Sequence, residues 1–170
     1  MQTTVRLGVI GLGNMGSVHC QLANKIDHLQ LTAVCDKNET RLSNAEAEWG
    51  CEGFSSADKL LQANVCDAVV LATPHFSHTT IGIAALKQGY HLLVEKPISV
   101  HKADATRLIR AYKNPRQIFA AMFNQRTHPG YRLIKQMLDD GRLGSVRRLQ
   151  WTITDWFRSQ QYYNLSLIHI

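Results

Sequence analysis

The stretch that decides the fold is Gly11-Leu12-Gly13-Asn14-Met15-Gly16, which directly follows the apolar run 4–10. It fits Gly-x-Gly-x-x-Gly at the corner between a buried strand and a helix predicted from Met15 to about Lys25. In such a corner the first glycine permits a tight turn, the second lets a pyrophosphate approach the backbone, and the third lets helix and strand pack closely. The free N–H groups and the dipole at the helix start then favour an anion.

Asp36 lies twenty residues after Gly16, at the end of a second predicted strand, 29–35. A carboxylate at that distance is placed to accept hydrogen bonds from the adenosine ribose of a dinucleotide, and it repels a 2′-phosphate. Lys37 and Arg41 are also close in sequence and could contact a phosphate, although solvated charges at a helix start are the simpler interpretation. NAD is therefore favoured as the cofactor, and NADP stays open as the alternative.

Strands and helices alternate from the glycine turn onward. Further strands are predicted at 52–54, 68–72, 91–94 and 118–123, and further helices at 38–48, 55–62, 79–88 and 99–113, the last one capped by Ser99. This alternation predicts an α/β fold with a doubly wound parallel sheet, helices on both faces and right-handed crossovers. The first domain is expected to span 1–123. A helix at 129–140 and a long strand at 146–153 predict the start of a second domain, incomplete within 124–164.

Composition and charge exclude several classes of protein. Hydrophobic residues make up 45% and charged residues 19% of the 170 residues, which is typical of a globular chain. The net charge of +6 divides into −2 over residues 1–94 (6 basic, 8 acidic) and +8 over 95–170 (13 basic, 5 acidic), but no nucleic-acid-binding motif accompanies it. The four cysteines are scattered, which indicates neither a disulfide framework nor a metal site. We expect a cytoplasmic protein with no metal, membrane or nucleic-acid partner.

A second motif follows the predicted strand at 68–72. It reads Ala72-Thr73-Pro74-His75, with His78 three residues further on. In doubly wound sheets ligands bind beyond the carboxyl ends of the strands. Thr73, Pro74, His75 and His78 are therefore predicted to belong to a cofactor loop rather than to act as acids or bases.

A third motif, Glu95-Lys96-Pro97, follows the strand at 91–94 on the same edge of the sheet. A lysine partly desolvated beside a cationic nicotinamide can give up its proton more readily and act on a substrate hydroxyl, so Lys96 is the predicted catalytic residue. Glu95 could orient it. Pro97 stiffens the turn and can hold a cis bond, although trans is commoner. A Glu–Lys surface pair without function is the alternative interpretation.

Together these motifs resemble the glucose–fructose oxidoreductase, inositol dehydrogenase and rhizopine-catabolism (Gfo/Idh/MocA) family over about residues 4–163. The resemblance includes Asn124-Gln125-Arg126, the helix end at 140–144 and the segment 154–158. It implies a Rossmann domain followed by an α+β domain that holds substrate contacts and a homo-oligomer interface. It also implies hydride transfer between NAD(P) and a secondary alcohol of a sugar, cyclitol or related polyol. By motif, Lys96 touches substrate and cofactor, Asn124 approaches the nicotinamide ribose, and Arg158 lies near the cofactor.

The chain departs from this family's pattern toward its end. Family members carry a Gly-rich segment followed by an Asp and a His four residues apart, the His being the expected general base, and no residue here matches them. Residues 165–170 (LSLIHI) resemble a translated sequencing adapter, so we expect a read-through tail on a truncated chain that binds cofactor without turnover. An NAD-dependent glycosidase of the same family and a non-catalytic dinucleotide-sensing protein stay open as alternatives. The intact Glu95-Lys96-Pro97 motif argues against the sensor.

Overall fold

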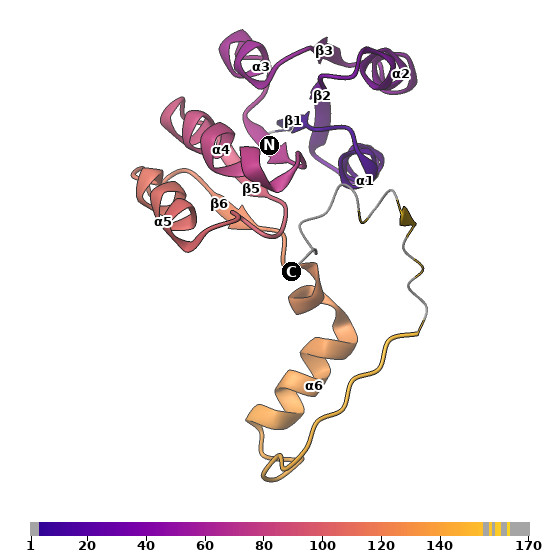
Figure 1. Ribbon diagram of the computed structural model, residues 1–170, viewed down its shortest axis with the longest axis vertical. Coiled ribbons are helices and arrows are strands. Elements are labelled where there is room, and N and C mark those ends of the chain that lie inside the picture. The colour runs from indigo at the N-terminus through magenta and orange to yellow at the C-terminus, as the bar shows by residue number, and fades with distance from the viewer. Residues whose placement is uncertain (1–3, 155–156, 158, 161–162, 164–170) are drawn as a thin grey trace. The chain divides into compact units, whose positions relative to one another are not determined.

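A computed structural model describes residues 4–154, 157, 159–160 and 163, and the chain divides after Met122 into two units. Strands and helices alternate through the first unit (Figure 1). Its strands are β1 (Val5–Ile10), β2 (Leu29–Cys35), β3 (Glu52–Phe54), β4 (Ala68–Leu71), β5 (His91–Val94) and β6 (Phe119–Ala121). Its helices are α1 (Asn14–Ala23), α2 (Glu39–Trp49), α3 (Ala57–Ala63), the short 3₁₀ helix η1 (His75–Ser77), α4 (His78–Lys87) and α5 (Lys102–Ala111).

The six strands form one parallel sheet in the order β3-β2-β1-β4-β5-β6. The predicted α/β class with a doubly wound parallel sheet is confirmed. The chain starts in the middle of the sheet, runs outward through β2 and β3, and returns to the other side of β1 at β4. The strand order therefore reverses between β1 and β4, and sheets of this kind bind ligands beyond the carboxyl ends of the strands at such a point.

Two apolar cores lie on the two faces of the sheet. Neighbouring residues of one strand, such as Val9 and Ile10, point to opposite faces, so a continuous apolar run fills both cores. Figure 1 shows α1 and α2 on one side of the strands and α3, α4 and α5 on the other. The first core receives Cys20 and Ala23 from α1, and the second receives Leu86 from α4 and Leu108 from α5.

Polar side chains set where the helices begin. The side-chain oxygen Oδ1 of Asn38 accepts a hydrogen bond from the Arg41 amide at the start of α2, as predicted. The predicted helix start at Ser99 is wrong, because α5 begins at Lys102 after His101. The Ser99 hydroxyl instead shares a hydrogen bond with the hydroxyl of Thr79, at the start of α4.

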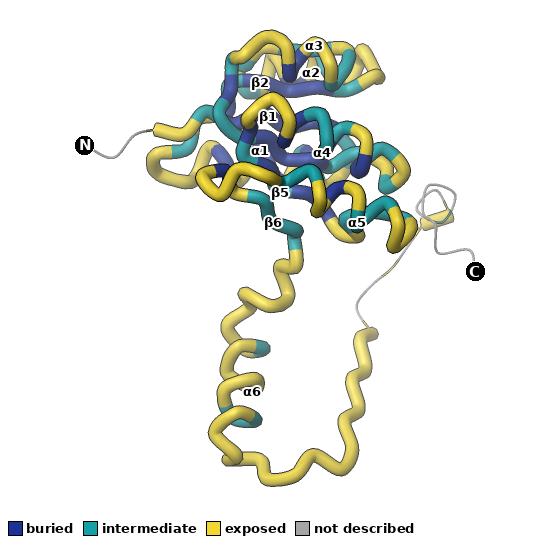
Figure 2. The backbone as a smooth tube through the Cα atoms, turned by 90° about the vertical axis from the view of Figure 1, so that its left-hand side faces the viewer, coloured by how far each residue is buried: buried dark blue, intermediate teal, exposed yellow. Residues whose placement is uncertain are grey.

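The second unit contains a 3₁₀ turn, η2 (Asn124–Thr127), and the helix α6 (Pro129–Asp139). The long strand predicted at 146–153 is wrong, since none of these residues is in a strand. An alternating apolar pattern yields a strand only when another strand accepts its backbone hydrogen bonds, and residues 142–154 have none in the part of the chain described. The apolar residues of the segment 142–154, including Leu149 and Trp151, are exposed. Figure 2 draws this segment after α6 in yellow, the colour of exposed residues.

Within the described residues, no helix combines the length and the apolar character needed to cross a membrane.

Candidate cofactor-binding site

Two glycines of the turn after β1 are required by the packing of the backbone. Gly11 has a φ of +95°, and a Cβ on it would lie 2.8 Å from backbone atoms of Ala72 and Thr73. A Cβ on Gly16 would lie 1.8 Å from the carbonyl oxygen of Gly11. These two positions therefore let β1, the end of β4 and the start of α1 come together without side chains between them.

Gly13 differs from its two neighbours in the motif. It is the N-cap residue of α1 with ordinary dihedral angles, and a Cβ on it would meet no described atom within 4 Å. Asn14 and Met15, the first residues of the helix, are exposed. The amides of a first helical turn have no partner within the helix, so they are free to donate to an anion. The protein's own packing leaves the space in front of Gly13 open, as a pyrophosphate would require.

The Asp36 carboxylate points into the glycine turn. Its Oδ2 accepts a hydrogen bond of 2.7 Å from the Leu12 amide, and its Oδ1 accepts one of 2.8 Å from the Asn38 amide. Arg41 Nη1 lies 3.9 Å from Oδ2. Each carboxylate oxygen can accept more than one hydrogen bond, so capacity for further donors remains. Asp36 is thus held beside the turn, with its charge partly balanced by Arg41.

A buried pair that the sequence analysis missed links α1 to the end of β5. His19 Nε2 lies 2.8 Å from Glu95 Oε1, and both residues are buried. Burial alone would raise the pKa of Glu95. Hydrogen bonds from the His19 side chain and the Lys96 amide, together with the positive charges of the His19 and Lys96 side chains, instead hold that pKa below its ordinary value. The pair therefore holds Glu95, the residue before Lys96, against α1.

Lys96 is exposed at the carboxyl end of β5. Its backbone amide donates a hydrogen bond of 3.1 Å to Glu95 Oε2, and its bond to Pro97 is cis. Glu95 therefore orients Lys96 through the backbone, and the lysine side chain itself is left at the surface.

The loop after β4 places its predicted residues at different depths. Pro74 is exposed and Thr73 half-buried, and the Ser77 hydroxyl donates to the Pro74 carbonyl oxygen at 2.8 Å. His75 is half-buried, and its pKa is lowered by burial first and then by the positive charges of His78 and Lys96. His78 is fully buried, so the structure places it behind the loop rather than on the surface that a ligand would touch.

Two further predicted residues are Asn124 and Arg158. Asn124 is exposed at the start of η2, in the second unit. Arg158 lies outside the described residues, as does the predicted tail at 165–170. Among the described residues, no three or more His, Cys, Asp or Glu side chains gather in a way that could hold a metal ion.

Comparisons with known proteins find dehydrogenases of cyclitols and nucleotide sugars. The chain is 31% identical over 152 residues to the myo-inositol 2-dehydrogenase of Thermotoga maritima, which covers 89% of this chain and 46% of that protein. It is 36% identical over 132 residues to the UDP-N-acetylglucosamine 3-dehydrogenase of Acidithiobacillus ferrooxidans, covering 78% and 41%. The chain thus spans less than half the length of these curated relatives.

Solved structures give the same result. The WlbA dehydrogenase of Bordetella pertussis, in complex with NADH and UDP-GlcNAcA, superimposes with a TM-score of 0.85 at 27% identity, covering 98% of this chain and 48% of that one. The scyllo-inositol dehydrogenase of Lactobacillus casei, with bound NAD(H) and scyllo-inositol, gives a TM-score of 0.79 at 29% identity, covering 84% and 43%.

The family model described as an oxidoreductase family with an NAD-binding Rossmann fold matches residues 5–123, which include the glycine turn, Asp36 and the Glu95-Lys96-Pro97 motif. The chain belongs to this Gfo/Idh/MocA oxidoreductase family, as its motifs predicted.

Proposed function

We propose that the whole protein is an NAD-dependent dehydrogenase of a secondary alcohol in a sugar, cyclitol or related polyol, and that this chain supplies its cofactor site and its catalytic lysine. The observation that carries the proposal is the open space at Gly13, in front of the free amides of α1 and beside the Asp36 carboxylate. The relatives named above, which include inositol and nucleotide-sugar dehydrogenases, support the substrate class.

The residues present fit a dinucleotide. The backbone of Gly11–Gly16 would hold the pyrophosphate, Asp36 the adenosine ribose, and Thr73, Pro74 and His75 would line the cofactor at the end of β4. When bound, NAD supplies the hydride acceptor that this chain's side chains lack. The Asp36 charge disfavours a 2′-phosphate, whereas Arg41 at 3.9 Å partly offsets it, so NAD is preferred and NADP is the weaker ligand.

Lys96 would act on the substrate. As an ammonium group, its exposed Nζ can donate a hydrogen bond to a substrate hydroxyl, and as a neutral amine the same Nζ could take up the hydroxyl proton and later return it. We assign no residue of this chain the role of general base, so we expect it to bind cofactor without turning over a polyol.

Direct titration tests the proposal. NADH and NADPH are added to the chain and binding is followed by nicotinamide fluorescence, with NADH expected to bind more tightly. Gly13→Ala should weaken NADH about tenfold, because its methyl group enters the space left for the pyrophosphate while meeting no protein atom. Gly130→Ala, in α6, is the matched control and should bind as the wild type does.

Asp36→Asn separates charge from shape. The carboxamide oxygen can still accept from the Leu12 amide, so the bond to the glycine turn is kept, while the negative charge and the bond from the Asn38 amide are removed. In this variant, the affinity for NADPH relative to the affinity for NADH should rise. A wild-type chain that binds neither nucleotide, or a Gly13→Ala chain that binds NADH unchanged, overturns the proposal.

A further inference from the structure

The first turn of α4 contacts both loops that carry the predicted cofactor residues. His78 Nε2 lies 2.8 Å from the carbonyl oxygen of Thr73, after β4, and His78 Nδ1 lies 2.9 Å from the carbonyl oxygen of Pro97, after β5. The ring is fully buried. Carbonyl oxygens only accept, so the imidazole is the donor in each bond it makes, and both bonds form together when both ring nitrogens carry a proton.

Strand pairing does not hold these two loops together. The ladder between β4 and β5 ends at the pair Leu71 and Val94, and one more backbone hydrogen bond joins the Glu95 amide to the Leu71 carbonyl oxygen at 2.9 Å. Thr73 and Pro97 lie beyond that point. The spacing of the loops at the carboxyl edge therefore depends on side chains, and His78 lies between them.

A second link runs from the same turn to the same loop. The hydroxyl of Thr79 shares a hydrogen bond with the hydroxyl of Ser99, two residues after Pro97. On the other side of Lys96, the Glu95 carboxylate accepts from the Lys96 amide. The backbone of Lys96 is thus fixed before and after the residue, while its side chain stays free at the surface.

We propose that His78 and Thr79, here called the α4 clamp, are positioning residues that set the distance between the Thr73 loop and the Lys96 turn and so hold Lys96 at the nicotinamide end of the cofactor. This inference rests on the proposed function. It replaces the direct cofactor contact predicted for His78 with an indirect role. The adenosine end depends on the glycine turn and Asp36, whereas the described side-chain hydrogen bonds of the clamp go to Thr73, Pro97 and Ser99.

Comparison of NADH with ADP-ribose, which lacks the nicotinamide ring, tests the clamp. The glutamine of His78→Gln carries its donors on a single nitrogen and can donate to only one of the two carbonyl oxygens. NADH should therefore bind about tenfold more weakly, while the affinity for ADP-ribose should change by less than about twofold. Ser99→Ala removes the second link at a half-buried surface position and should weaken NADH about threefold. His101→Gln, an exposed histidine in the same loop, is the matched control and should change neither ligand.

The pattern of losses decides the outcome. Equal weakening of NADH and ADP-ribose in His78→Gln would show that the ring only stabilises the fold, and wild-type binding of both ligands in His78→Gln and Ser99→Ala would also overturn the inference. If His78→Gln does not fold, judged by circular dichroism, Ser99→Ala decides the matter through the same ratio. A wild-type chain that binds neither ligand refutes the proposed function and this inference with it, whereas normal wild-type binding with unaffected variants refutes the inference alone.

Discussion

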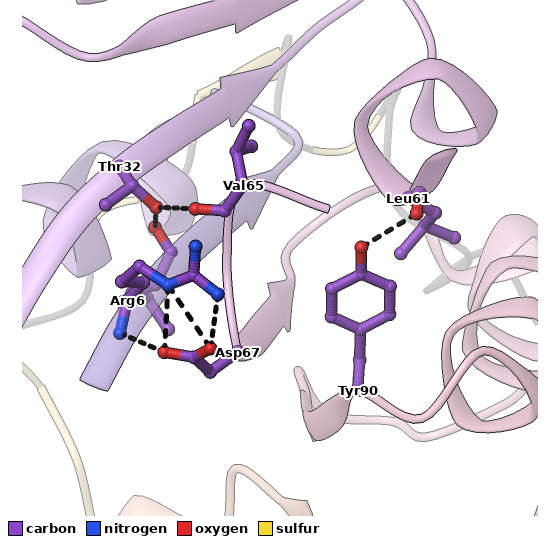
Figure 3. A network of polar contacts seen from close by, with 7 residues as sticks. Arg6, Thr32, Leu61, Val65, Asp67 and Tyr90 are labelled. Carbon is purple, nitrogen blue, oxygen red and sulfur yellow. Dashed lines mark hydrogen bonds and ion pairs between the residues drawn. The ribbon is translucent and has the colours of Figure 1, made fainter. Parts of the chain in front are cut away.

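The two edges of the sheet differ in how many of their polar groups are left for a ligand, because the carboxyl edge has outward-facing donors in addition to side chains paired within the protein. At the amino edge the polar side chains bond to the protein itself, as Figure 3 shows. Arg6 Nη2 lies 2.6 Å from Asp67 Oδ1, the Thr32 hydroxyl donates to the Val65 carbonyl oxygen at 2.9 Å, and Tyr90 donates similarly to a carbonyl of α3. At the carboxyl edge the first amides of α1 and the Lys96 side chain face outward.

This difference separates stability from binding. A polar group that already has its partner within the protein stabilises the fold and has little left for a ligand, whereas an exposed donor without one costs the fold little and remains available. Substitutions at the amino edge should therefore change the free energy of unfolding and leave cofactor affinity alone. Those at the outward-facing groups of the carboxyl edge should do the reverse.

Gly16→Ala should have the largest effect, because it disrupts the close packing of α1 against the glycine turn at the carboxyl edge. The new Cβ would lie 1.8 Å from the Gly11 carbonyl oxygen, and only a displacement of α1 from β1 relieves that clash. We expect a loss of about 3 kcal/mol or more in the free energy of unfolding and no measurable NADH binding, checked by urea unfolding and by fluorescence titration.

Gly13→Ala is the control for that substitution, since it is the same chemical change three residues earlier in the turn. It should cost about 1 kcal/mol or less, the scale of an N-cap replacement, and still weaken NADH. Equal stability of the two variants would contradict the packing role assigned to Gly16.

His19→Ala should have the next largest effect. The substitution leaves the buried Glu95 carboxylate without its side-chain partner, which we expect to cost about 2–3 kcal/mol in urea unfolding at pH 7. His19→Gln should recover part of this loss, because its carboxamide can donate to the same oxygen. Wild-type stability in His19→Ala would show that the pair contributes nothing.

The pH dependence of that loss follows from the lowered pKa of Glu95. A carboxyl group whose folded pKa lies below its unfolded value of about 4.3 stabilises the fold above that pH, and the stabilisation is lost as the pH falls through the folded pKa. The difference in unfolding free energy between wild type and His19→Ala should therefore be full at pH 7 and shrink below about pH 4. A difference that stays constant between these pH values would contradict an ionised Glu95 in the folded protein.

The sequence predicted what depends on neighbours along the chain and missed what depends on distant partners. The glycine turn, Asp36 and the alternation of elements lie within short segments whose spacing dictates geometry. His19 was missed because its partner lies 76 residues away, and nothing in α1 alone marks that helix face as the one that meets the end of β5.

Two other outcomes have the same cause. His78 is buried between the carbonyl oxygens of Thr73 and Pro97, which follow β4 and β5 and come near each other only when those strands are paired. The strand predicted at 146–153 failed because an apolar alternation cannot supply the strand that it must pair with.

Tyr90→Phe should have the smallest effect and gives the cleanest test of the comparison between the edges. The Tyr90 hydroxyl donates to the Leu61 carbonyl oxygen at 2.7 Å, and the ring is buried in the core beside α3 and α4. Phenylalanine keeps the ring and removes this one bond, so we expect a loss of about 1 kcal/mol in urea unfolding. NADH affinity should not change, because Tyr90 precedes β5 and lies at the opposite end of that strand from Lys96. Gly13→Ala should give the opposite result, with NADH binding weakened about tenfold and most of the stability kept. Tyr90→Phe could instead lower the affinity for NADH as much as Gly13→Ala does. That result would show that the amino edge is coupled to the site through β5, and that stability and binding are not divided between the two edges.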